Sequence, residues 1–360
     1  MGDFGVIEQI LDLARWAPSG DNTQPWRFEL IDESHIVVHG FDTREHCVYD
    51  LDGRPSQISL GALLETISIA AVAHHLRTNI ARRRDAVDTQ PTFELAFVAD
   101  PAIQTDPLVH QIRVRSVQRR PMQRRPLTQA EKRSLDDSVD PAHQVLWLEG
   151  FGARLQTARL MFANAKLRLT MPEAYRVHRD IIHWGARYSE DRVPDQALGV
   201  DPLTTHLMRW IMGSWQRVEF FNRFLAGTLV PRIQMDFLPG VACAAHFVLL
   251  AKQAPQSIDD YVAAGRAVQR FWLTLTGLGL VMQPELTPLI FARYVREGRE
   301  FSKTAGMPEQ ARKLAARLGT MIGEKNSERA VFMGRLGAGP VATARSTRRK
   351  LTDLLVPAQP

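Results

Sequence analysis

Residues 14–28 read ARWAPSGDNTQPWRF, and this stretch says more about the fold than any other part of the chain. A helical pattern of apolar residues over 3–17 leads into it and ends at Pro18, and a run with strand character follows at 26–30. Between them, Ser19 and Asn22 stand in a loop where small polar side chains and free N–H groups can contact a flat, heteroatom-rich ligand. The segment therefore predicts a helix, a ligand-binding loop and a strand, with turn capping as the alternative role of Ser19 and Asn22.

Working outward, strands and helices follow one another on both sides of a basic, proline-bounded connection at 106–126. The apolar patterns predict strands at 26–30, 35–40, 93–99, 145–148, 241–250 and 280–283, and helices at 59–76, 128–136, 153–169, 173–184, 202–227 and 258–277. The helices at 59–76 and 258–277 carry small residues that permit close packing against a neighbour. They suggest a remote two-fold repeat.

Composition excludes several classes of protein. With 360 residues, 45% of them hydrophobic, the chain can build a large core, in one fused unit or about two. Cys47 and Cys243 are far apart and the start lacks a secretory pattern, so we expect a cytoplasmic protein. No uninterrupted apolar run reaches the roughly 18 residues of a membrane span, so no membrane partner is expected. The net charge is +6, and its basic clusters lack interleaved aromatics, so no nucleic-acid partner is expected.

The stretch 14–28 resembles the A-R-x-A-P-S-x-x-N-x-Q-P-W-x-F signature of the FMN-dependent nitroreductase family. A second stretch, RSVQR at 115–119, is similar to the family's R-x-S-x-R phosphate motif, with Val117 at the serine position. The arginine motif follows the P-S-x-x-N loop here, which is the order of the internally duplicated, Acg-like branch. Further similarity to that branch lies at 41–44, 50–54, 59–65, 119–121 and 335–337.

This resemblance implies an α+β, nitroreductase-like fold in which two fused halves form a pseudo-dimer in one chain, each a central antiparallel-type sheet flanked by helices. Half one would be residues 1–105, with the P-S-x-x-N loop. Half two would be 106–360, with the arginine motif, a helical insertion at about 172–227 and a C-terminal basic arm. A monomer is expected because the dimer interface is internal. The aromatics of the insertion would either fill core or close over the ligand as a lid.

The resemblance also implies one FMN per chain, because residues after about 160 contain no second P-S-x-x-N loop. Its expected binding residues are Pro18, Ser19 and Asn22 from half one, and Arg115, Arg119, Gln283, Pro284, Leu286, Arg348 and Arg349 from half two. The arginines would hold the phosphate through charge-assisted hydrogen bonds. No metal site is expected, because no histidine pair is joined by a convincing ligand set.

The flavin would accept hydride from NAD(P)H and pass electrons to a small acceptor, so no catalytic side chain is expected. The acceptor would be an aromatic, nitro, quinone or pathway-specific compound. In many family members a P-x-E-G turn offers an N–H donor near the flavin, and here Leu286 and Thr287 stand at the Glu-Gly positions. That change leaves open two alternatives, a non-catalytic flavin store of the Acg type and oxygen-dependent chemistry on the flavin itself. Nucleic-acid binding through the basic clusters is the alternative from a different class of function.

Overall fold

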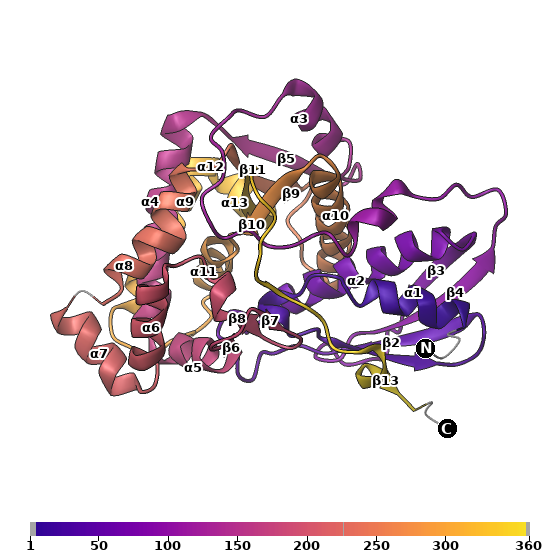
Figure 1. Ribbon diagram of the computed structural model, residues 1–360, viewed down its shortest axis with the longest axis horizontal. Coiled ribbons are helices and arrows are strands. Elements are labelled where there is room, and N and C mark those ends of the chain that lie inside the picture. The colour runs from indigo at the N-terminus through magenta and orange to yellow at the C-terminus, as the bar shows by residue number, and fades with distance from the viewer. Residues whose placement is uncertain (1–4, 226, 358–360) are drawn as a thin grey trace.

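Two β-sheets, each flanked by helices, organise the chain (Figure 1). The computed structural model describes residues 5–225 and 227–357. The first sheet has the order β13-β1-β2-β4-β3. Its members are β13 (Leu355–Val356), β1 (Trp26–Leu30), β2 (His35–Gly40), β4 (Thr92–Ala99) and β3 (Leu76–Arg82). The β1–β2 hairpin and β4 confirm the predicted strands, whereas β3 was not predicted.

The second sheet has the order β10-β11-β9-β5, with antiparallel neighbours throughout. It consists of β10 (Leu280–Pro284), β11 (Ala330–Ala338), β9 (Ala245–Ala251) and β5 (His143–Leu148). Strand β9 lies between two neighbours and is buried on both faces, which explains its continuous apolar run. The two sheets with their helices confirm the predicted α+β class.

Helices α2 (Arg54–Val72) and α10 (Ile258–Gly277) pack against each other between the sheets. Gly61 and Gly265 lie where they cross, and a Cβ on either would overlap a backbone carbonyl of the other helix. Glu65 of α2 forms ion pairs of 2.8 Å with both Arg266 and Arg270 of α10. The small residues thus permit the close packing predicted from the sequence. Helix α2 is also long and apolar enough to cross a membrane, but 83% of its most apolar window is buried inside the protein.

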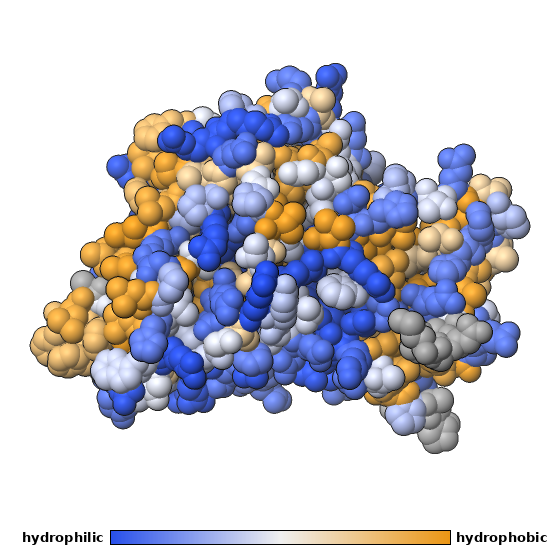
Figure 2. All heavy atoms as spheres, viewed as in Figure 1, coloured by the Kyte–Doolittle hydropathy of each residue, from blue (hydrophilic) through white to orange (hydrophobic). Residues whose placement is uncertain are grey.

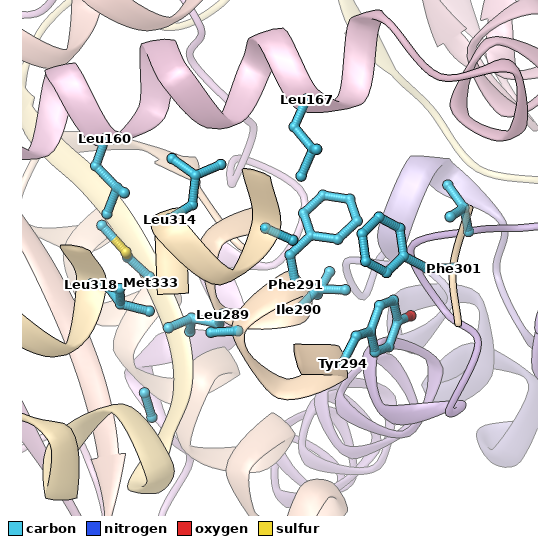
Figure 3. Close-up of a cluster of buried hydrophobic side chains, with 14 of the residues drawn as sticks. Leu160, Leu167, Leu289, Ile290, Phe291, Tyr294, Phe301, Leu314, Leu318 and Met333 are labelled. Carbon is cyan, nitrogen blue, oxygen red and sulfur yellow. The ribbon is translucent and has the colours of Figure 1, made fainter. Parts of the chain in front are cut away.

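A further group of helices packs against the second sheet. It contains α4 (Gly150–Leu169), α11 (Thr287–Arg296), α12 (Met307–Ile322) and α13 (Glu324–Arg329). Leu160 and Leu167 of α4 face Phe291 of α11 and Leu314 of α12 in one buried cluster (Figure 3). Helices α1 (Val6–Ala14) and α3 (Gln129–Asp136) cover the outer parts of the two sheets.

The helices from α5 to α8, which include the segment 172–227 that the sequence predicts as an insertion, lie at one end of the molecule (Figure 1). Helix α5 (Pro172–Ile181) is followed by three short strands, β6 (Ile182–His183), β7 (Tyr188–Ser189) and β8 (Val193–Pro194), and then by α6 (Pro202–Ile211), α7 (Trp215–Phe224), α8 (Leu229–Arg232) and α9 (Leu238–Val241). The helical prediction over 202–227 is confirmed by two helices, α6 and α7. The chain breaks after α6, and Ser214 starts α7 by accepting a hydrogen bond from the Arg217 N–H.

The C-terminal arm, residues 339–357, runs from β11 back across the molecule to the first sheet, as the yellow trace in Figure 1 shows. On the way β12 (Arg345–Ser346) pairs in parallel with β7. The arm ends in β13, which pairs in parallel with β1. The arm therefore ties the second sheet, the insertion and the first sheet together.

Candidate functional site

A cavity of about 400 Å³ lies where the predicted ligand loop, the arginine motif, the end of β10 and the C-terminal arm meet. Nine of the ten predicted binding residues line it: Pro18, Ser19, Asn22, Arg115, Arg119, Gln283, Pro284, Leu286 and Arg348. Arg349 does not. Its backbone N–H donates to the Gln24 side chain, and its guanidinium lies 3.7 Å from Asp191. Residues up to 330 positions apart in the chain thus line one cavity, whose volume is typical of small-molecule and cofactor sites.

The loop after α1 has an unusual backbone. Asp21, Asn22 and Gln24 have φ values of 50°, 63° and 50°, in the left-handed region that L-residues rarely adopt. Each such residue costs on the order of 1 kcal/mol or more and persists only where its surroundings impose it. Strain concentrated in a cavity-lining loop is typical of a functional site.

Side-chain hydrogen bonds impose this loop conformation. The Asn22 amide donates to backbone carbonyls of the insertion and of the arm, at 3.1 Å to Glu190 and 3.2 Å to Thr347. Gln24 donates to the Glu190 carbonyl at 2.8 Å, and the Ser19 hydroxyl accepts from the Gln24 N–H at 3.0 Å. Ser19 and Asn22 therefore cap the turn as well as line the cavity. The Asn22 Oδ1 is buried and has no hydrogen-bond partner among the described residues.

Three arginines gather at one end of the cavity. Arg115 and Arg348 are buried, with 2% and 7% of their surface exposed, and Arg345 is half-buried beside them. All three donate only to backbone carbonyls among the described residues: Arg115 to Trp16, Arg345 to residues 113 and 115, and Arg348 to residues 17, 346 and 347. Arg115 also stacks on the Trp272 ring, 4.5 Å from its centroid.

These guanidinium groups are held together at an electrostatic cost. Burial, and then the charges of Arg348 and Arg345, lower the pKa of Arg115 well below its usual value. Burial, Arg345 and Arg15 lower the pKa of Arg348 to about 9. No carboxylate within the described ranges pairs with any of the three side chains. A cluster of desolvated cations without a counter-charge is suited to an anion with several oxygens, such as a phosphate.

Arg119 lies among different charges. It donates to the Ala197 carbonyl at 3.1 Å, and burial lowers its pKa to about 10 while Asp21 opposes that shift. Burial in turn raises the pKa of Asp21, which Arg119 and Arg168 partly offset. The structure thus brings Arg345 rather than Arg119 or Arg349 to Arg115 and Arg348. Sequence reasoning missed Arg345, although it belongs to the same basic cluster, 344–350, as Arg348.

A buried charged triad contributes to the cavity wall through Glu285 and Arg335. Glu285 accepts from His246 Nδ1 at 2.7 Å and from Arg335 Nη1 at 2.8 Å, and all three side chains are at most 2% exposed. The charge of Glu285 raises the pKa of His246 to about 10 against the effect of burial. Arg335 also donates to the Arg119 carbonyl at 3.0 Å. The triad therefore links the arginine motif to the segment 283–287, where α11 begins at the cavity wall.

The insertion contributes part of the cavity wall. Met208 of α6 and Met212, directly after that helix, line the cavity, together with His178 of α5 and Tyr49 of the loop after β2. The Tyr49 hydroxyl and His178 Nε2 are hydrogen-bonded at 3.0 Å. Burial and the nearby Arg168 lower the pKa of His178 to about 3, so its ring is neutral near pH 7. Part of the insertion thus lines the cavity, through His178, Met208 and Met212.

Fold and site together define an α+β protein with a cavity of small-molecule size lined by buried arginines. The nitroreductase family model matches residues 3–51, which comprise α1, the strained loop, β1 and β2. This match supports a relationship to the nitroreductase family, whose members generally bind flavin, usually FMN.

Two curated relatives come from Mycobacterium tuberculosis, the uncharacterized proteins MT3212 (strain CDC 1551 / Oshkosh) and Rv3127 (strain H37Rv). Each is 44% identical over 80 residues, which are 21% of this chain and 23% of the relative. The chain therefore matches about a quarter of each relative's length. Among solved structures, a nitroreductase-like family protein from Bacillus cereus aligns with a TM-score of 0.34 and 11% identity, over 69% of this chain and 95% of that one.

Proposed function

We propose that this protein is an FMN-binding, nitroreductase-like oxidoreductase that passes electrons from NAD(P)H to a small acceptor of the aromatic, nitro, quinone or pathway-specific kind. One observation carries the proposal: the loop that matches the family lines one cavity of about 400 Å³ together with three arginines that have no counter-charge among the described residues. A cofactor with a flat heteroaromatic ring and a phosphate fits both features, because the ring can contact the loop and the phosphate can pair with the arginines.

The residues present fit such a cofactor. Arg115, Arg345 and Arg348 would hold the phosphate, because a dianion removes the repulsion among them. Two buried polar atoms without described partners, Asn22 Oδ1 and Gln283 Oε1, belong to residues that line the same cavity and would satisfy groups at the ring edge.

When bound, FMN supplies the two-electron redox chemistry, and the chain supplies binding and electrostatics. The N-terminal end of α11 at Thr287 favours negative charge on a bound ligand, as does Arg119. Tyr49, Met208 and Met212 exclude water from the part of the cavity that they line. None of these roles requires a side chain that gives or takes a proton.

We further propose that the two sheet units form a pseudo-dimer with one flavin per chain. The support is the crossing of α2 and α10 at Gly61 and Gly265, and the C-terminal arm, which brings Arg345 and Arg348 from the second unit to the loop of the first. The sequence holds a single P-S-x-x-N loop, so one complete site is expected. A monomeric, cytoplasmic protein is consistent with this arrangement.

Anaerobic titration tests the proposal. The purified chain is saturated with FMN, its flavin content is measured, and NADPH or NADH is added without oxygen while spectra are recorded. We expect one flavin per chain and bleaching of the flavin band. A chain that binds no FMN at saturation, or binds two per polypeptide, contradicts the proposed site.

A flavin store of the Acg type is the second candidate, favoured by Leu286 and Thr287 in place of the Glu-Gly pair at the cavity wall. In that case one FMN binds, but the flavin stays oxidised when NADPH or NADH is added. The same titration therefore separates the two functions.

A further inference from the structure

An exposed apolar surface covers the outside of the insertion. Half of the 18 large hydrophobic side chains that are exposed in the described chain lie between 203 and 238. This apolar face consists of Leu203, Leu207, Trp210, Phe220, Phe224, Leu225, Leu229, Val230 and Leu238. Figure 2 shows it as orange and tan spheres at the lower left, where α7 and α8 lie in Figure 1. Soluble monomers rarely expose a large apolar patch without a binding function.

The face is continuous across two helices. The Trp210 ring of α6 meets Phe221 of α7 at a centroid distance of 5.9 Å. Phe220 lies 6.0 Å from Phe221 and 5.2 Å from Phe224. Trp210, Phe220 and Phe224 are nevertheless 50%, 52% and 63% exposed. The rings thus form one aromatic surface with its outer side open to solvent.

Positive charge borders this surface. Arg209, Arg217 and Arg223 are exposed, and Glu219 is the one exposed acidic residue in the described ranges 202–225 and 227–238. Arg217 lies over the Trp210 ring at 4.6 Å and Arg223 over Phe224 at 5.4 Å. Arginines that lie along aromatic rings with their charged ends in solvent are typical of helices at a membrane interface.

We propose that the apolar face docks on an anionic lipid surface, with α6 and α7 lying in the plane of the headgroups. Leu, Phe and Trp would enter the boundary of the acyl chains, and Arg209, Arg217 and Arg223 would meet lipid phosphates. A second copy of the chain is a poorer partner, because the same three arginines would face each other with one glutamate per copy. Other residues of the same region, Met208 of α6 and Met212 directly after it, line the cavity.

Vesicle sedimentation tests this proposal without any cofactor or substrate. The full-length protein is mixed with vesicles of phosphatidylcholine and phosphatidylglycerol (seven to three) or of phosphatidylcholine alone. We expect sedimentation with the anionic vesicles and a loss of binding in high salt. Phe224→Ser should weaken binding by about tenfold, because it removes one inserted ring. The double variant Arg217→Glu and Arg223→Glu should weaken it by at least about tenfold.

Phe151→Ser is the matched control, because Phe151 on α4 is 62% exposed and Phe224 is 63% exposed. It should bind the vesicles as the wild type does. Equal loss of binding in Phe151→Ser and Phe224→Ser, or no sedimentation with anionic vesicles, overturns the proposal. Light scattering that shows a dimer which Phe224→Ser dissociates also overturns it, since a second copy would then cover the face.

Discussion

Replacing Arg348 by methionine should weaken FMN binding strongly and leave the ligand-free protein almost as stable as before. Arg348 is buried beside Arg115 and Arg345, and its pKa of about 9 lies far below the 12.5 of an unperturbed guanidinium. At about 1.4 kcal/mol for each pKa unit, that difference corresponds to a cost on the order of 5 kcal/mol for keeping the side chain charged without a ligand.

The substitution removes this cost and creates another. Arg348 donates to the carbonyl of Ala17 at 2.9 Å, which would be left without a partner at a cost of about 1–3 kcal/mol, and to that of Thr347 at 2.6 Å, which still accepts from the Asn22 amide. The lost bonds and the removed charge oppose each other, so the melting temperature of the ligand-free variant should not fall by more than about 5 °C. The lost charge-assisted hydrogen bonds should weaken FMN binding by about 1.5–3 kcal/mol, which is roughly tenfold to 150-fold.

The assay compares FMN with riboflavin, which lacks the phosphate, by fluorescence titration of the wild type and Arg348→Met. The loss should be confined to FMN, and riboflavin affinity should change by less than about threefold, since the two ligands share the ring. Arg349→Met is the matched control, because the Arg349 side chain does not line the cavity, and it should bind both ligands as the wild type does. Equal losses for FMN and riboflavin, or a ligand-free Arg348→Met that unfolds far below the wild type, would refute the assignment of Arg348 to a phosphate.

Three further predictions concern the scaffold of the site. Gly265→Ala should lower the free energy of unfolding, measured by urea titration, by about 3 kcal/mol, because its Cβ would overlap a carbonyl of α2. Gly277→Ala on the same helix is the control, since its Cβ has room and the change should be nearly neutral. Asn22→Ala should lower the melting temperature and FMN occupancy together, since the left-handed loop loses the bonds that impose it; an unchanged melting temperature would contradict this. The pKa of His246 is raised from 6.5 to about 10, so its ion pair with Glu285 stabilises the fold fully below pH 6.5 and is lost as the pH rises toward 10. The unfolding free energy of the wild type should fall by more than about 2 kcal/mol between pH 6.5 and 9.5, and His246→Gln should flatten that slope.

The elements that the sequence predicts are those with a local cause. The helix at 258–277 was predicted with the bounds that α10 has, because its apolar period lies within the segment. The β1–β2 hairpin follows from two short strand patterns around a turn. The loop at 18–22 was found because its signature is contiguous in sequence.

The missed elements depend on distant partners. Strand β11 carries two glycines and Arg335 among its nine residues, and it is buried because β10 and β9 flank it. Its arginine pairs with Glu285, 50 positions earlier, so no local pattern shows that the charge is neutralised. Arg345 was missed for the same reason, since only the path of the arm along β7 brings it to Arg115. Nine of the ten predicted site residues nevertheless line the cavity, because each motif that meets there has its own local signature.

The course of the C-terminal arm makes the ligand cavity depend on the order of the whole chain. The arm delivers Arg345 and Arg348 to Arg115, and its Thr347 carbonyl receives the Asn22 amide of the strained loop. Both contacts are costly in the ligand-free protein. The first brings cations together that repel one another, and the second holds the loop in a left-handed backbone conformation. A ligand whose phosphate offsets the repulsion therefore stabilises the arm, the loop and the β7 region at once, by an amount that grows with its concentration relative to the dissociation constant. The same contacts join the first sheet to the insertion. Ligand binding should therefore stabilise both sheets against unfolding in one cooperative transition, rather than stabilise the arm alone.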